Sequence, residues 1–151
     1  MEIWQAILAN RLLCAAFIAW FVAQVLKLLI EAWRSKKLEL NLLWSSGGMP
    51  SSHSSTVCAL ATGSAMLYGL SSFEFAMSAI FAMVVMYDAS GVRRETGKQS
   101  KLLNLILESD ISEWASLETF DENLKELVGH TPLQVTSGAI LGFLIAWYYV
   151  C

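Results

Sequence analysis

Four long apolar segments constrain this chain more than any other feature of its sequence. They cover about 12–30, 56–70, 73–87 and 133–150, and polar connections separate them. A helix of roughly 20 apolar residues can cross a bilayer. With 56% hydrophobic and only 15% charged residues, the pattern predicts an all-α, polytopic membrane protein. We expect about four transmembrane helices in a single domain over residues 1–151.

The sequence allows more than one interpretation of where some of these spans begin and end. Residues 1–10 are mildly amphipathic, and either lie at the membrane interface or extend the first span; they do not have the pattern of a cleaved signal peptide. Lys27 is expected near the end of the first span, where its long side chain can reach the interface. The third span is expected to end between Tyr87 and Val92.

The longest connection, 95–129, is acidic. It contains eight carboxylates and three lysines, with helical periodicity over 99–108 and a second short helical pattern over 120–128. We expect a solvated, partly helical loop between spans three and four.

The positive charges are distributed unevenly. Nine of the ten lysines and arginines lie in or near the connections after spans one and three, and only Arg11 lies elsewhere. The positive-inside rule then places those connections in the cytoplasm, or its organellar equivalent, and both termini on the opposite side. The sequence has no basic face of the kind that binds nucleic acid. Its three cysteines show no disulfide framework or metal-ligand spacing.

The polar stretch 45–56, SSGGMPSSHSST, leads directly into the second span. Ser51 or Ser52 after Pro50 suits the N-cap of a helix, and a helix N-terminus favours a bound anion. His53 would lie in the first turn, where it can exchange a proton near neutral pH. One interpretation is a phosphate pocket beside a histidine. The other is a flexible serine-glycine loop before an ordinary capped helix.

The second histidine, His130, stands just before the last span. Thr131, Pro132 and Gln134 form a capping-box pattern that predicts a helix start. Further along this span, two glycines predict a face for close helix packing: Gly138 and Gly142.

The predicted topology places both histidines on the same side of the membrane as the cations Lys27, Arg34, Arg93 and Arg94. Cations and backbone donors can neutralise phosphate oxygens, while one histidine attacks phosphorus and the other protonates the leaving oxygen. This chemistry needs no metal, and the sequence has no carboxylate cluster of the kind that magnesium prefers. The alternative is a pair of capping-region histidines with an ordinary charge bias.

These residues resemble the type-2 phosphatidic acid phosphatase superfamily, which includes the vanadium-dependent haloperoxidases. The resemblance rests on Lys27 with Arg34, on the stretch 50–53 (PSSH), and on a split third element of Ser90–Arg94 and His130. The segments GGMPSSHS, YDASGVRR and GHTP are most similar to a small divergent membrane branch of that superfamily, across nearly the whole chain.

The resemblance implies hydrolysis of a phosphomonoester or diphosphate on a membrane lipid, without a cofactor. It implies a phosphohistidine on His130 and a role for His53 as the acid for the leaving group. The residues that it implies for phosphate binding are Lys27, Arg34, Ser51, Ser52 and either Arg93 or Arg94.

The sequence also departs from the superfamily pattern. Ser35 replaces a proline, Ser52 replaces a glycine, and 35 residues (95–129) separate the arginines from His130. Gln134 stands where an aspartate normally orients the nucleophilic histidine. Either another acid such as Asp88 substitutes, or the activity is weak, or the chain is a catalytically silent protein that binds a lipid phosphate or a partner. A vanadate-type oxidative enzyme is a third reading, and the small body suggests that a homodimer completes the fold.

Overall fold

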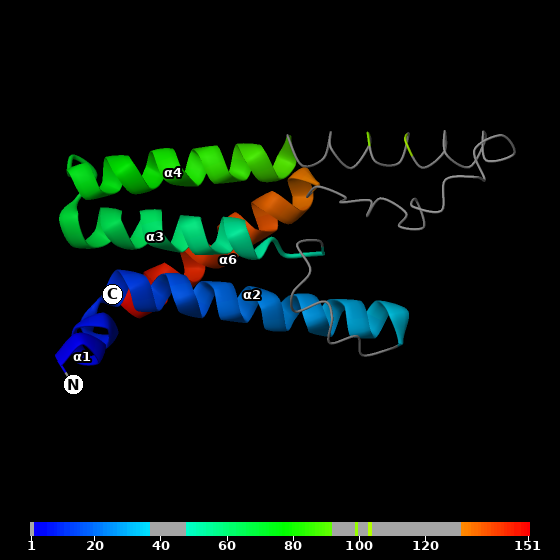
Figure 1. Ribbon diagram of the computed structural model, residues 1–151, viewed down its shortest axis with the longest axis horizontal. Coiled ribbons are helices and arrows are strands. Elements are labelled where there is room, and N and C mark those ends of the chain that lie inside the picture. Colours follow the sequence, from blue (N-terminus) through cyan, green and yellow to red (C-terminus); the bar gives the residue numbers. More distant parts are fainter. Residues whose placement is uncertain (1, 37–47, 92–98, 100–102, 104–130) are drawn as a thin grey trace, which may run out of the picture.

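The computed structural model describes residues 2–36, 48–91, 99, 103 and 131–151. Its elements are α1 (Glu2–Ala9), α2 (Arg11–Ser35), α3 (Ser52–Tyr68), α4 (Phe73–Ser90) and α6 (Pro132–Val150), shown in Figure 1. All five are α-helices, so the prediction of an all-α protein is confirmed for the part of the chain that is described. The predicted acidic, partly helical loop lies outside the described residues.

The four long helices alternate in direction along the bundle (Figure 1). Helix α3 is central, since it packs against α2, α4 and α6, and α6 also packs against α2. The two chain termini and the α3–α4 turn lie at one end of the bundle. The starts of α3 and α6 and the ends of α2 and α4 lie at the other end, which we call the motif end because the sequence motifs described above adjoin these helix ends in the chain.

Three of the described helices are long and apolar enough to cross a membrane: α2, α4 and α6, with mean hydropathies of 2.2, 1.4 and 1.4. Helix α3 has 17 residues, so it is about 26 Å long. The prediction of a polytopic helical protein with about four membrane helices agrees with this bundle.

Helix α3 begins and ends earlier than the predicted span 56–70. Ser51 caps its start, so the helix begins at Ser52. Gly69 ends it, with a φ of +85° that glycine adopts readily, and its N–H bonds to the Ala65 carbonyl. Hydropathy located the span, and capping set its bounds.

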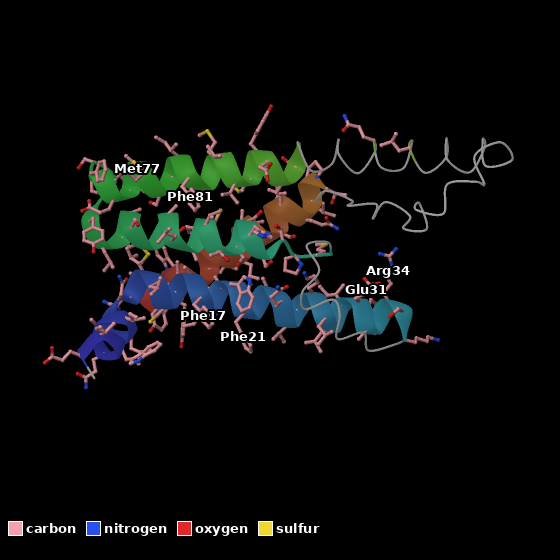
Figure 2. The ribbon with its side chains drawn as sticks, viewed as in Figure 1. Phe17, Phe21, Glu31, Arg34, Met77 and Phe81 are labelled. Atoms are coloured by element: carbon pink, nitrogen blue, oxygen red, sulfur yellow. The ribbon has the colours of Figure 1, made fainter. Side chains whose placement is uncertain are left out.

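The interior of the bundle is built from small side chains. Ala19, Ala59 and Ala146 are completely buried and pack together across α2, α3 and α6. Large apolar side chains point outward instead: Figure 2 shows Phe17 and Phe21 on the side of α2 that faces away from α3, and they are 64% and 56% exposed. Small residues inside and large apolar residues outside suit a helical bundle surrounded by lipid.

Helix α1 is separate from the first span. The Asn10 side chain caps α2 by accepting a hydrogen bond from the Leu13 N–H at 3.1 Å, and this breaks the helix. The Arg11 guanidinium then donates to the Val150 carbonyl at 2.9 Å. A cation at the C-terminus of a helix is favourable, so this contact stabilises the junction between the start of α2 and the end of α6. Residues 1–10 therefore do not simply extend the first span.

Candidate phosphate site

The candidate site is centred on the N-terminus of α3. Ser51 is the N-cap, and its hydroxyl oxygen accepts hydrogen bonds from the Ser54 N–H at 3.4 Å and the Ser54 hydroxyl at 3.1 Å. Ser51 is completely buried, Ser52 is 5% exposed, and His53 is exposed in the first turn. The sequence left two candidates for the N-cap, and the structure selects Ser51.

The start of α6 is joined directly to this cap. The backbone N–H of Ser51 donates to the Gln134 carbonyl at 3.0 Å. One turn further, Gly138 lies so close to the Ser51 carbonyl that a Cβ atom at that glycine would collide with it. Gly142 meets the Ser55 carbonyl in the same way. The predicted small-residue packing face is therefore confirmed, and α3 is its partner.

Lys27 reaches the site from α2 and is buried there. The helix continues eight residues beyond it to Ser35, and Lys27 is only 3% exposed. The prediction that Lys27 reaches out to the interface near the end of its span is therefore wrong. Gly48 has a φ of +94°, and a Cβ atom there would lie 2.7 Å from Cδ of Lys27. The aliphatic part of Lys27 thus lies against Gly48, shortly before the start of α3.

Arg34 follows Lys27 by seven residues on α2, so it lies two turns further along the same helix face, about 10 Å away. Its side chain is exposed at the motif end, and Figure 2 shows it beside the last turns of α2. Lys36 then ends the helix with a φ of +55°. Asp88 is partly buried in the last turn of α4, at the motif end.

Gln134 takes part in the predicted capping box. Its side-chain oxygen Oε1 accepts a hydrogen bond from the Thr131 N–H at 2.9 Å, and its own N–H bonds to the Thr131 hydroxyl at 3.4 Å. The capping box is confirmed. The amide at this position therefore stabilises the start of α6.

Three site residues lie outside the described residues: Arg93, Arg94 and His130. Their described neighbours are Gly91, at the end of α4, and Thr131, at the start of α6, and both are at the motif end (Figure 1). Among the described residues, no three histidine, cysteine, aspartate or glutamate side chains form a group that could hold a metal.

Two contacts at the site could not be anticipated from the sequence. The Ser55 hydroxyl donates to the Ala19 carbonyl at 3.1 Å and joins α3 to α2 inside the bundle. The second is the contact of Gly48 with Lys27. The only signal for either was the high content of small residues between Gly47 and Ser64, which favours close packing without identifying the partner.

Comparison with known proteins supports one family. A family model described as "Divergent PAP2 family" matches residues 8–145. The chain is 43% identical over 148 residues to the uncharacterized membrane protein YuiD of Bacillus subtilis (strain 168), covering 92% of this chain and 93% of that protein. No solved structure matches it.

Proposed function

Because the chain belongs to the divergent PAP2 family, we propose that it is a membrane phosphatase that hydrolyses a phosphomonoester or diphosphate on a membrane lipid. The observation that carries the proposal is the burial of Lys27, 3% exposed, against Gly48 at the capped start of α3. A buried cation next to the N-terminus of a helix is a suitable environment for a phosphate group, because both favour negative charge.

The proposed reaction has two steps. A ring nitrogen of His130 attacks phosphorus, forming a P–N bond as the bond to the lipid oxygen breaks, and His53 gives that oxygen a proton. In the second step His53 takes a proton from water, and the resulting hydroxide displaces His130 and releases phosphate. His53 lies in the first turn of α3 and is exposed, which suits contact with a leaving group outside the bundle.

Binding of the phosphate group is assigned to donors at the motif end. The first turn of a helix has N–H groups without an acceptor inside the helix, and here these belong to α3. Lys27 and Arg34 supply positive charge from α2, and Arg93 or Arg94 supplies the third-motif arginine. Fixed donors and cations stabilise the charge that develops on the phosphoryl oxygens in the transition state.

We propose a lipid as the substrate because of where the candidate site lies. Helices α2, α4 and α6 have the length and apolarity of membrane spans, and the candidate site is at one end of them. A lipid whose tails remain in the bilayer would present its headgroup at that level. The excess of lysine and arginine near this end supports a cytoplasmic position for the site.

A second candidate function is a catalytically silent protein that binds a lipid phosphate. The contact that favours it is the bond from the Thr131 N–H to Oε1 of Gln134 at 2.9 Å. An oxygen used in a helix cap is less available to orient His130, and an amide cannot stabilise an imidazolium ion as a carboxylate does.

An assay of phosphate release distinguishes between the two candidate functions. The purified protein in lipid nanodiscs is given a panel of lipid phosphomonoesters and diphosphates, with and without vanadate, beside a His130→Ala control. The phosphatase predicts release that vanadate inhibits and that the control lacks. Binding of a lipid phosphate without release, equal in both proteins, would instead establish the silent binder.

A further inference from the structure

Helix α1 has one apolar face and one polar face. All eight of its residues, Glu2–Ala9, are exposed. Because a helix turns once every 3.6 residues, its four large apolar side chains fall on one face and its other residues on the opposite face. The side chains of the apolar face are between 38% and 76% exposed, and they are Ile3, Trp4, Ile7 and Leu8. Large apolar side chains gathered on one exposed face mark a surface that contacts a membrane or another protein.

Hydrogen bonds hold the junction between α1 and α2. The Asn10 N–H donates to the Ile7 carbonyl at 3.2 Å, and the Cys14 thiol donates to the Leu8 carbonyl at 3.4 Å. These carbonyls at the end of α1 therefore have partners although the helix stops there. The change of direction between α1 and α2 is thus a defined part of the fold.

Helix α1 extends toward the side of the bundle that suits lipid. Figure 1 shows it turning away from α3 at the start of α2, and Figure 2 shows Phe17 and Phe21 on that same side of α2. Leu13, which is 50% exposed, lies four residues before Phe17 and continues this apolar face to the first turn of α2. The lipid-facing surface therefore reaches the junction with α1. With eight residues, α1 is only about 12 Å long, which is too short to cross a bilayer.

We propose that α1 is an interfacial helix, seated with its apolar face in the bilayer surface at the end of the bundle opposite the candidate phosphate site. Trp4 suits this position, because tryptophan has an apolar ring and a polar N–H and is enriched at the headgroup level. Glu2 is the one charged residue of α1, so the helix binds by burying apolar side chains and not by attraction to anionic lipids. This position of α1 is independent of any phosphatase activity.

Spin labels on the full-length protein in lipid nanodiscs test this position. Cysteines are introduced one at a time over 2–9 in a protein with Cys58→Ala, Cys151→Ala and Cys14→Ser, the last of which keeps a donor for the Leu8 carbonyl. All of these positions are exposed, so the labels should leave the fold unchanged. Labels on the apolar face should be most accessible to oxygen, at a depth of about 5–10 Å. Labels on the polar face should be most accessible to a water-soluble nickel complex.

Two neighbouring substitutions on opposite faces form a matched pair, read out by a label at Leu8→Cys. Trp4→Asp should lower the oxygen accessibility of the label and raise its nickel accessibility, because a carboxylate on the apolar face is costly to bury in the bilayer. Gln5→Asp adds the same charge on the polar face and should leave both accessibilities unchanged. Nanodiscs of phosphatidylcholine, with and without phosphatidylglycerol, should give the same results.

Three outcomes would overturn the proposed position of α1. Low accessibility to both reagents on the apolar face would mean that protein covers it, either a second copy or another part of this chain. High nickel accessibility on both faces would mean that the helix lies in water. A pattern that appears only with phosphatidylglycerol would mean that lipid charge, and not the apolar face, holds the helix at the membrane.

Discussion

The backbone N–H of Ser51 lies 3.0 Å from the backbone carbonyl of Gln134 and donates a hydrogen bond to it. This bond joins the cap of α3 to the first turn of α6, although the two residues are far apart in the sequence. The segments 50–53 (PSSH) and 131–134 (TPLQ) are therefore held at one end of the bundle, and in the sequence His130 directly precedes the second of them. A site that uses both histidines requires this arrangement, because neither segment could supply the chemistry alone.

The packing of α6 on α3 predicts that Gly138→Ala destabilises the protein. The added methyl group would collide with the Ser51 carbonyl, which is backbone and cannot rotate away. We expect a loss of about 1–3 kcal/mol, as for other overpacked interiors, measured by denaturation in detergent. Leu144→Ala on the same helix is the control, since Leu144 is 56% exposed and its loss should cost about 0.5 kcal/mol or less. Equal stabilities would contradict the close contact.

The contact between Gly48 and Lys27 gives a prediction for anion binding. Gly48→Ala should weaken vanadate affinity, because the new methyl group displaces the Lys27 stem 2.7 Å away. Gly69→Ala is a matched control: Gly69 also has a positive φ, +85°, but a Cβ atom there meets nothing within 4 Å. Both substitutions strain the backbone, and only the first moves Lys27. If both change vanadate affinity equally, Lys27 has no part in the site.

Local patterns in the sequence predicted much of this fold. The Ser51 cap, the Thr131–Gln134 capping box and the Gly138–Gly142 face each depend on neighbours within one turn, so the sequence carries them directly. The burial of Lys27 could not be predicted in this way. Hydropathy falls near Glu31 and so predicts the end of the first span there, whereas the helix continues to Ser35 and leaves Lys27 in the interior.

Contacts between segments that are distant in the chain could not be predicted from the sequence either. That Gly138 meets Ser51, or Gly48 meets Lys27, depends on how the helices are placed around α3. Small residues permit such contacts without selecting among partners. The roles of Arg93, Arg94 and His130 remain predictions from the family motifs.

The two cations at the end of α2 should differ in their effect on binding. Arg34→Ala should weaken vanadate affinity more than Lys36→Ala, because a guanidinium can form a bidentate contact with an oxyanion. Arg34 also shares a helix face with Lys27, whereas Lys36 lies past the last helical turn. Titration of each purified variant with vanadate makes the comparison. Equal losses would remove Arg34 from the site.

The charge distribution predicts which side of the membrane each end of the bundle faces. In a protein without native cysteines, Ser35→Cys at the motif end should react with an impermeant thiol reagent only from the cytoplasmic side. A protein that keeps Cys151 alone should react only from the opposite side, because Cys151 is exposed at the other end. Labelling of both from one side would contradict the proposed topology.

The central claim is that His130 carries the phosphoryl group during turnover, and direct detection of that intermediate tests it. Purified protein turning over a radiolabelled lipid phosphate is stopped with alkaline denaturant, because acid would hydrolyse the P–N bond of phosphohistidine, and the labelled peptide is identified. The account predicts label on the peptide that contains His130, label that is lost on acid treatment, and none in His130→Ala. Steady release of phosphate by the wild-type protein with no label on His130 would contradict it.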